Sequence, residues 1–199
     1  MMRIFVASAP GVEEMLGAEV RAAGLVPVVT PGGVEVEGDL GVLYRLGLEV
    51  GLGLRLLVRL GEVTAKRFEQ LVRGVGELDW APWVAPGAPV AVKVAVAKSR
   101  LFHTGAIDQR VREGVARRLG AEPGPGSDAD AVSIQVRGRA DRFTISIDAG
   151  GGLLSRRGYR LESGKAPLRE DLARALVIAS GWDRQSPLAD PMCGSGTIA

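Results

Sequence analysis

The 199-residue sequence contains one cysteine, one histidine and no asparagine. A single cysteine cannot form a disulfide within the chain, which agrees with a reducing compartment. Cys193 and His103 also supply too few ligands for a four-ligand zinc site of cysteine and histidine, so no metal is expected. Glutamine is scarce as well, and depletion of thermolabile amides hints at a thermophilic source.

Long apolar runs are also lacking, since stretches such as residues 56–58 and 94–97 are far shorter than a membrane span requires. The first residues turn acidic within fourteen positions, which is unlike a basic-then-apolar signal peptide. With 46% hydrophobic and 24% charged residues, the composition is typical of a globular protein of one large or two small domains. A cytoplasmic protein without membrane contact is therefore expected.

The net charge is only +2, but it is unevenly distributed along the chain. Residues 1–90 hold 8 Lys/Arg against 11 Asp/Glu, a balance of −3, whereas residues 91–199 hold 17 against 12, a balance of +5. Arginine accounts for 21 of the 25 basic residues, and its planar guanidinium suits phosphate groups. The second half is thus expected to meet an anion, with nucleic acid as the first candidate. A general arginine preference of a GC-rich genome is the alternative explanation.

Apolar periodicity predicts a mixture of strands and helices throughout. Roughly the first 60 residues give the order strand, helix, strand, strand, helix, strand, which is the ferredoxin-like order. Within it, a Pro-Gly-Gly turn indicates a hairpin and Asp39 a helix N-cap. Further on, the pattern predicts helices over 65–75 and 103–120, with strands at 90–98, 131–138 and 142–150. A helix over 167–182 and a short strand at 187–190 follow.

The last six residues, Gly194 to Ala199, fit the pattern G-x-G-x-x-G/A, after an expected strand and at the expected opening of a helix. Glycines let the backbone turn tightly, and the N–H groups of a new helix point at an anionic part of a ligand. By itself the pattern suits a dinucleotide, the carboxylate of S-adenosylmethionine, or no ligand. A Walker phosphate loop is excluded, because no lysine follows the second glycine.

The stretch DPMCGSGT, residues 190–197, resembles motif I of S-adenosylmethionine-dependent methyltransferases that act on RNA or DNA bases. Taken with RRGYR and KAPLREDLARALVIASGW, it looks very like the bacterial THUMP-domain methyltransferases that modify guanine N2 in RNA. APGVEEMLGAEVRAAG, GGVEVEGDL and SRLFHTGAIDQRV are similar to the ferredoxin-like and THUMP parts of that family. DPMCGSGT together with APLRE is most similar to the branch acting on 23S ribosomal RNA, and the tRNA branch remains an alternative.

This resemblance implies an α+β chain with a ferredoxin-like unit at 1–62, a THUMP RNA-binding domain at 63–152 and a linker at 153–166. The truncated start of a Rossmann-like methyltransferase domain would occupy 167–199. S-adenosylmethionine is the implied cofactor. Carried over residue by residue, the implied cofactor-binding residues are Asp190, Met192, Cys193, Gly194, Gly196 and Thr197. Cys193 is expected to fit the turn rather than act as a nucleophile.

The resemblance also implies that the THUMP domain holds structured RNA, which proteins recognise mainly by shape and phosphate contacts. The candidate contacts in this domain are Lys98, Ser99, Arg100, His103, Arg110, Arg117, Arg118, Arg137, Arg139 and Arg142. In the segment before the methyltransferase domain, Arg156, Arg157 and Arg160 either contact RNA or hold the domains together. His103 is expected to stack on a base or to make a hydrogen bond at the helix start.

The chemistry of this family uses a second motif, N/D-P-P-Y/F, and no such tetrapeptide occurs here. A lone strand–turn–helix start cannot complete a cofactor cleft. The chain is therefore expected to be the RNA-binding front of a methyltransferase, with no catalytic residue of its own, little activity and weak cofactor binding. Two alternatives are a non-catalytic RNA-binding adaptor and a nicotinamide-dependent oxidoreductase. The latter requires an acidic residue about 20 positions after the motif, which would lie beyond Ala199.

Overall fold

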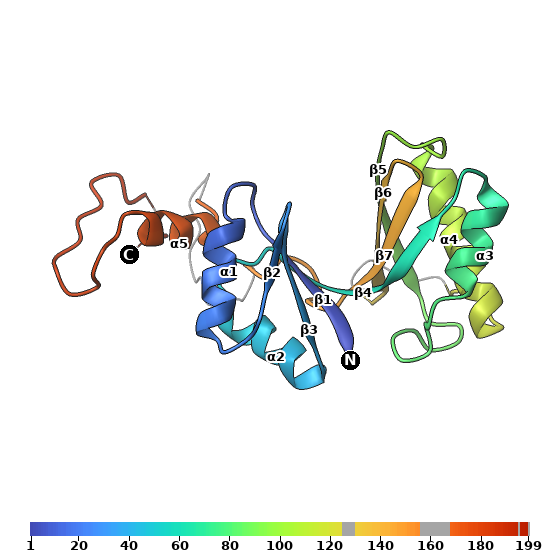
Figure 1. Cartoon of the computed structure of the whole chain (residues 1–199), viewed down its shortest axis with the longest axis horizontal. Helices are drawn as coiled ribbons and strands as arrows, with labels where there is room; N and C mark the ends of the chain where they lie inside the picture. The colour runs from blue at the N-terminus through green and yellow to red at the C-terminus, as the bar shows by residue number, and fades with distance from the viewer. Residues whose placement is uncertain (125–129, 156–167, 195, 199) are drawn as a thin grey trace. The chain divides into compact units, whose positions relative to one another are not determined.

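The computed structural model describes residues 1–124, 130–155, 168–194 and 196–198. The chain forms two compact units, the first made of Met1–Leu56 with Gly150–Ala199 and the second of Leu57–Ala149. Strands and helices occur in both units (Figure 1), which confirms the predicted α+β class. In chain order the elements are β1 (Met2–Ala7), α1 (Glu13–Ala22), β2 (Val28–Thr30), β3 (Gly33–Gly38), α2 (Leu40–Glu49), β4 (Arg55–Thr64), α3 (Phe68–Gly76), β5 (Val90–Ala97), α4 (Thr104–Leu119), β6 (Val132–Arg139), β7 (Arg142–Asp148) and α5 (Glu170–Ala179).

The first unit contains an antiparallel sheet in the order β2-β3-β1, against which α1 and α2 pack (Figure 1). The N–H of Leu54 donates to the carbonyl oxygen of Ala7 at 2.7 Å, so the chain that enters β4 runs beside β1. This is the predicted ferredoxin-like order. Its core is formed by alternating strand residues and by one side of each helix: Ile4, Val6, Leu16, Val20, Val34, Val36, Leu43 and Leu46.

Two carboxylates determine where the helices of this unit begin. Asp39 accepts a hydrogen bond from the N–H of Val42 at 3.0 Å, which makes it the N-cap of α2, as predicted. Glu13, the first residue of α1, accepts from the N–H groups of Gly11 at 2.7 Å and Gly32 at 3.1 Å. Its own backbone N–H and that of Gly32 lower the pKa of the Glu13 carboxyl. Glu13 therefore ties the start of α1 to the β2–β3 turn.

Helix α5 is attached to the ferredoxin-like part of the first unit through Glu19. One carboxylate oxygen of Glu19 accepts from the backbone N–H groups of Gly51 at 3.1 Å and Leu52 at 2.9 Å. The other forms an ion pair with Arg174 of α5 at 2.5 Å. A Cβ on Gly51 would lie 2.6 Å from the Arg174 side chain, so a larger residue at this position would displace the Arg174 side chain. The boundaries predicted at residues 62 and 152 stay predictions, and the proposed linker lies mostly outside the described residues.

The second unit contains the strand order β4-β7-β6-β5, with β7 antiparallel to both β4 and β6, and β5 parallel to β6. Helices α3 and α4 cover one face of these strands (Figure 1). The two helices approach closely at Gly114, where an added Cβ would lie 2.6 Å from Val75. The core cluster consists of Val63, Ala65, Leu71, Val75, Trp80, Val84, Val90, Leu101, Ile107, Val111, Val115, Ile134, Val136, Phe143, Ile145 and Ile147.

The end of the chain differs from the sequence-based expectation. At the described positions between 181 and 198 there are turns and bends but neither strand nor helix. The strand predicted at 187–190 is therefore wrong for this chain, while the helix opening predicted after it stays a prediction because it falls partly outside the described residues. A strand is stabilised by hydrogen bonds to a neighbouring strand, and no described strand pairs with residues 187–190. The backbone instead uses local bonds, such as the one from Trp182 Nε1 to the carbonyl oxygen of Ser186 at 2.8 Å.

Asp183 organises this terminal segment and should titrate abnormally. Its Oδ1 accepts from the Ser186 N–H at 2.8 Å, the Ser186 hydroxyl at 2.7 Å and the Gln185 N–H at 2.9 Å. These bonds, led by that from the Ser186 N–H, lower the pKa of Asp183 from 3.8 to about 2. Because the folded-state pKa is depressed, the stabilisation is complete above the unfolded pKa of 3.8 and is lost as the pH falls through about 2.

Carboxyl NMR is the measurement that checks this value. We expect a midpoint near pH 2 for Asp183 in the parent chain. In Ser186→Ala the midpoint should rise, because the hydroxyl bond is lost while both backbone bonds remain. An ordinary aspartate titration in the parent chain would show that the turn does not form in solution.

Candidate nucleic-acid interface

The β6–β7 hairpin brings together residues that lie some forty positions apart in the sequence. Its two-residue turn, Ala140 and Asp141, has φ values of 49° and 64°. Asp141 accepts from the backbone N–H of Arg100 at 2.6 Å and donates its own N–H to the Ser99 hydroxyl at 3.1 Å. The segment after β5 is thereby fastened to the hairpin turn.

Lys98, Ser99, Arg100, Asp141 and Arg142 form the hairpin-end cluster. The side chains of Arg100 and Arg142 are 70% and 69% exposed, and Lys98 is exposed at a φ of 52°. Arg100 lies 3.9 Å from an oxygen of Asp141, and Arg142 pairs with Glu62 at 2.7 Å. Exposed ion pairs contribute little in water, so these guanidinium groups remain available to an incoming phosphate.

Arg137 and Arg139 continue this basic surface along β6. Arg139 is directly opposite Arg142 on β7 and Ala97 on β5, and Arg137 is opposite Ala95. Both arginines alternate with the buried Val136 and with Gly138, so they project from the face of the sheet opposite α3 and α4. Both are exposed. The structure therefore brings five of the predicted cationic contacts to one end of the sheet: Lys98, Arg100, Arg137, Arg139 and Arg142.

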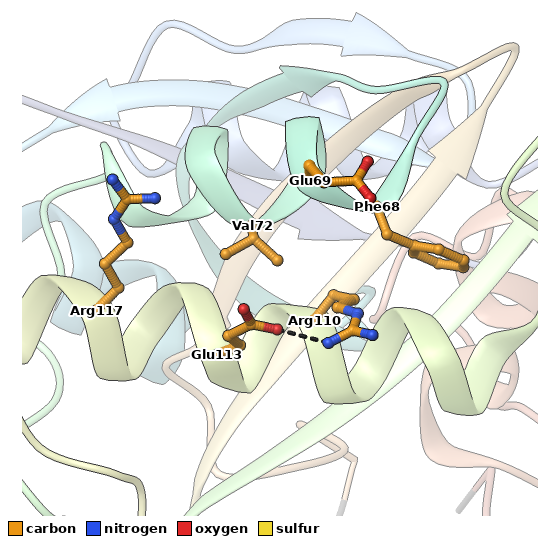
Figure 2. Close-up of a pocket in the computed structure, with 6 residues that line it drawn as sticks. All are labelled: Phe68, Glu69, Val72, Arg110, Glu113 and Arg117. Carbon is orange, nitrogen blue, oxygen red and sulfur yellow. Dashed lines mark hydrogen bonds and ion pairs between the residues drawn. The ribbon is translucent and has the colours of Figure 1, made fainter.

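The predicted contacts on α4 have different surroundings. Arg110 pairs with Glu113 at 2.7 Å and lies 6.0 Å from the ring centre of Phe68. A groove of about 420 Å³ between α3 and α4 is lined by these three residues together with Glu69, Val72 and Arg117 (Figure 2). The carboxylates of Glu69 and Glu113 in this lining would repel a phosphate group, so the groove is a poor phosphate site.

Arg117 and Arg118 are exposed in the last turn of α4. At 1.5 Å per residue, Arg117 lies about 20 Å along the helix from its first residue, Thr104. The ten candidates of this domain thus do not form one continuous cluster. Arg156, Arg157 and Arg160 lie outside the described residues.

His103 is the N-cap of α4, but its side chain makes no capping hydrogen bond. The predicted hydrogen bond at the helix start is therefore wrong, because the imidazole ring lies instead against Phe102, with 4.2 Å between ring centres. Phe102 is 63% exposed. Sequence reasoning missed this aromatic neighbour, although an exposed phenylalanine beside a histidine is a surface on which a base can stack.

Two lysines were also missed by sequence reasoning. The N–H of Ala65 donates to the carbonyl oxygen of Asp141 at 2.9 Å, which places the exposed Lys66 one residue from the hairpin end. Lys93 lies on β5 opposite Gln135 and is exposed. The alternation of residues 90–97 could have indicated Lys93, since it is the one charged residue in an otherwise apolar strand.

The residues predicted to bind the cofactor form one tight turn. Asp190 accepts from the N–H of Met192 at 3.0 Å, and the N–H of Gly196 donates to the carbonyl oxygen of Cys193 at 2.8 Å. Gly194 and Gly196 have φ values of 55° and 72°, which glycine adopts without strain. The absence of side chains at these glycines lets a ligand approach the backbone of the turn closely. No helix N-terminus follows the turn at the described positions to supply further N–H donors.

Other kinds of site find no support in the described parts of the chain. No group of three or more His, Cys, Asp or Glu residues there is placed to hold a metal ion. Among the helices that the structure describes, none combines the length and apolar character needed to cross a membrane.

The chain joins two α+β units to a terminal segment that contains a glycine turn. Three family models match it: the RlmL ferredoxin-like domain at residues 3–57, the THUMP domain at 65–148 and the RMKL-like methyltransferase domain at 157–199. These matches confirm the resemblance of the sequence to the THUMP-domain methyltransferases.

Individual relatives match over the whole chain. It is 38% identical to the ribosomal RNA large subunit methyltransferase K/L of Methylococcus capsulatus, over 100% of this chain and 28% of the relative. The same enzyme of Syntrophotalea carbinolica is 36% identical over 98% of this chain and 29% of its own length. The chain thus spans under a third of these relatives.

Solved structures agree on the fold. A protein of Listeria monocytogenes named as a predicted N6-adenine-specific DNA methylase superposes with a TM-score of 0.90 at 31% identity, over 99% of this chain and 53% of that one. A methyltransferase candidate solved in complex with SAH gives a TM-score of 0.89 at 29% identity, with the same coverage. The chain spans about half the length of each.

Proposed function

We propose that this chain is the RNA-binding part of an S-adenosylmethionine-dependent methyltransferase that modifies guanine N2 in 23S ribosomal RNA. One observation carries the proposal: all three matched domains occur in order along a chain that aligns throughout with enzymes named ribosomal RNA large subunit methyltransferase K/L. The exposed basic end of the second unit supports it, because phosphate contacts dominate RNA affinity. The activity is proposed to be cytoplasmic.

Each part of the chain has a proposed role. The hairpin-end cluster and the arginines beside it hold RNA phosphates, within a THUMP domain at 63–152 that follows a ferredoxin-like unit at 1–62. After the linker at 153–166, the turn from Asp190 to Thr197 surrounds the methionine part of the cofactor, which supplies the methyl group. The described residues around this turn form neither strand nor helix, so the chain by itself is expected to bind the cofactor weakly.

Mass mapping of methylated nucleosides tests this function. Deleting the gene in its source organism should remove one N2-methylguanosine from 23S ribosomal RNA, and the intact gene should restore it. Loss of a tRNA methylguanosine instead would favour the tRNA branch, and loss of an N6-methyladenosine would contradict guanine as the target. Unchanged RNA would favour the non-catalytic adaptor.

Calorimetry should detect no micromolar binding of S-adenosylmethionine to residues 1–199, and a micromolar affinity would contradict the proposed weak binding.

A further inference from the structure

The face of the second sheet opposite α3 and α4 carries its own row of cations. The valines of β5 pack toward the core, so Lys93, Ala95 and Ala97 project from the other face, and all three are exposed. In the parallel register Ala95 is opposite Arg137 and Ala97 opposite Arg139. The alanine side chains are short and do not block access to the backbone beside these cations, so a ligand can approach the strands closely.

These cations have no ionic partner in the part of the chain that the structure describes. Among residues 1–124, 130–155 and the described part of the C-terminal segment, no carboxylate forms an ion pair with Lys93, Arg137 or Arg139. Glu62, the acidic residue nearest along this face, is already paired with Arg142 at 2.7 Å. The row is therefore positively charged in the free protein.

The arrangement has a cost for folding. Arg139 and Arg142 are directly opposite each other on adjacent strands, and like charges in this position destabilise a sheet. Arg137 lies two residues along the same strand and on the same face as Arg139, which adds to the repulsion. An external polyanion would remove this repulsion on binding.

The chemistry of the face also indicates which form of RNA it suits. The only aromatic residue of β5, β6 and β7 is Phe143, which is fully buried on the core side. Single-stranded nucleic acid is usually held by bases stacked on aromatic side chains. Double-helical RNA hides its bases and is held through phosphates and its shape. A cationic strand surface without aromatic residues therefore matches a helical segment.

We propose that Lys93, Arg137 and Arg139, here called the sheet-face row, bind the phosphate backbone of a double-helical RNA segment. The inference rests on the proposed function, because it extends the RNA contact from the hairpin end onto the exposed part of the sheet face opposite α3 and α4. It places RNA on the sheet side of this unit and not on the side of α3 and α4.

The test uses the whole 199-residue chain and an RNA duplex of about 16 base pairs, the span covered by a typical double-stranded RNA-binding domain. The sheet-face variant is Lys93→Gln/Arg137→Gln/Arg139→Gln, and the charge-matched helix-side control is Arg21→Gln/Arg45→Gln/Arg73→Gln, with one exposed arginine from each of α1, α2 and α3. Loss of three phosphate contacts should reduce the slope of log K against log salt by about 2.7. Between 50 and 200 mM salt, the parent should then lose about 40-fold more affinity than the sheet-face variant. The control should behave like the parent.

Several results would overturn the inference. One is a sheet-face variant that binds the duplex as the parent does, and another is a helix-side control that loses more affinity. Tighter binding of the parent to a single-stranded oligouridine of equal length would exclude a helical segment as the ligand. If the parent bound no RNA of either form, the proposed RNA-binding function itself would fail, which separates the two conclusions.

A footprint on the parent chain avoids any effect of substitution on folding. An amine-reactive reagent should label Lys93 at least several-fold more slowly when the duplex is bound, and high salt should abolish the protection. Equal labelling of Lys93 with and without saturating duplex would overturn the inference even if the variants misfolded.

Discussion

Replacing Trp80 with alanine is expected to lower the free energy of unfolding of the second unit by about 3–5 kcal/mol, the usual cost of removing a buried tryptophan. Trp80 is fully buried in the core cluster of this unit. Its Nε1 donates to the carbonyl oxygen of Val75 at 2.8 Å, while its own carbonyl oxygen accepts from the N–H groups of Trp83 and Val84. The change therefore creates a cavity where the connector to β5 packs against α3.

Urea denaturation followed by far-UV circular dichroism measures this loss, and Trp83 provides the matched control. Trp83 lies three residues away but is only partly buried, so Trp83→Ala should cost clearly less. Trp80→Phe should also cost less than Trp80→Ala, since it keeps most of the apolar volume. Equal losses for Trp80→Ala and Trp83→Ala would show that Trp80 is not the centre of this core.

The fold was predictable wherever local pattern and tertiary packing agree. The spacing of Ile107, Val111 and Val115 predicted the buried side of α4, and all three are fully buried. Helix α3 starts later than the apolar pattern indicates, at Phe68 and not at Ala65. Gln70 explains the difference. Its side chain accepts hydrogen bonds from the N–H groups of Lys66 and Arg67, which caps the N-terminus of α3 and fixes its start at Phe68.

The end of the chain shows the opposite case. Residues 187–190 have the pattern of a buried strand, yet a strand pattern states only what a segment prefers once it has neighbours. The turn at Asp190 formed as expected because its hydrogen bonds are local. The strand before it and the helix after it depend on partners that the described residues do not provide.

The candidate site was predictable by residue type but not by arrangement. Sequence spacing placed Arg110 with the hairpin arginines, because they share a basic region of the chain. In the structure Arg110 forms an ion pair with Glu113. Arg100 instead contacts Asp141, which lies 41 positions further along the chain. Such a contact follows from the β6–β7 register and its turn, which depend on the whole sheet. Lys66 was missed for the same reason, whereas the alternation of residues 90–97 already indicated Lys93.

The hairpin-end cluster leads to the second large effect, on RNA affinity. Lys98→Gln/Arg100→Gln is expected to weaken binding of structured ribosomal RNA by about 60-fold at 0.1 M salt, because each phosphate contact contributes roughly 8-fold there. The slope of log K against log salt should fall by about 1.8. Both side chains are exposed, and the backbone N–H of Arg100 that bonds Asp141 is retained, so the fold should be unaffected.

Filter binding over a range of salt concentrations, with Arg21→Gln/Arg73→Gln as the control, distinguishes a local contact from a general charge effect. The control removes two exposed positive charges from helices α1 and α3, so it changes the net charge equally but away from the hairpin. If both double variants lost affinity to the same extent, net charge alone would account for binding and the hairpin end would not be a site. A loss confined to Lys98→Gln/Arg100→Gln, and similar for RNAs of different sequence, is the result expected of phosphate contacts, which carry no base preference.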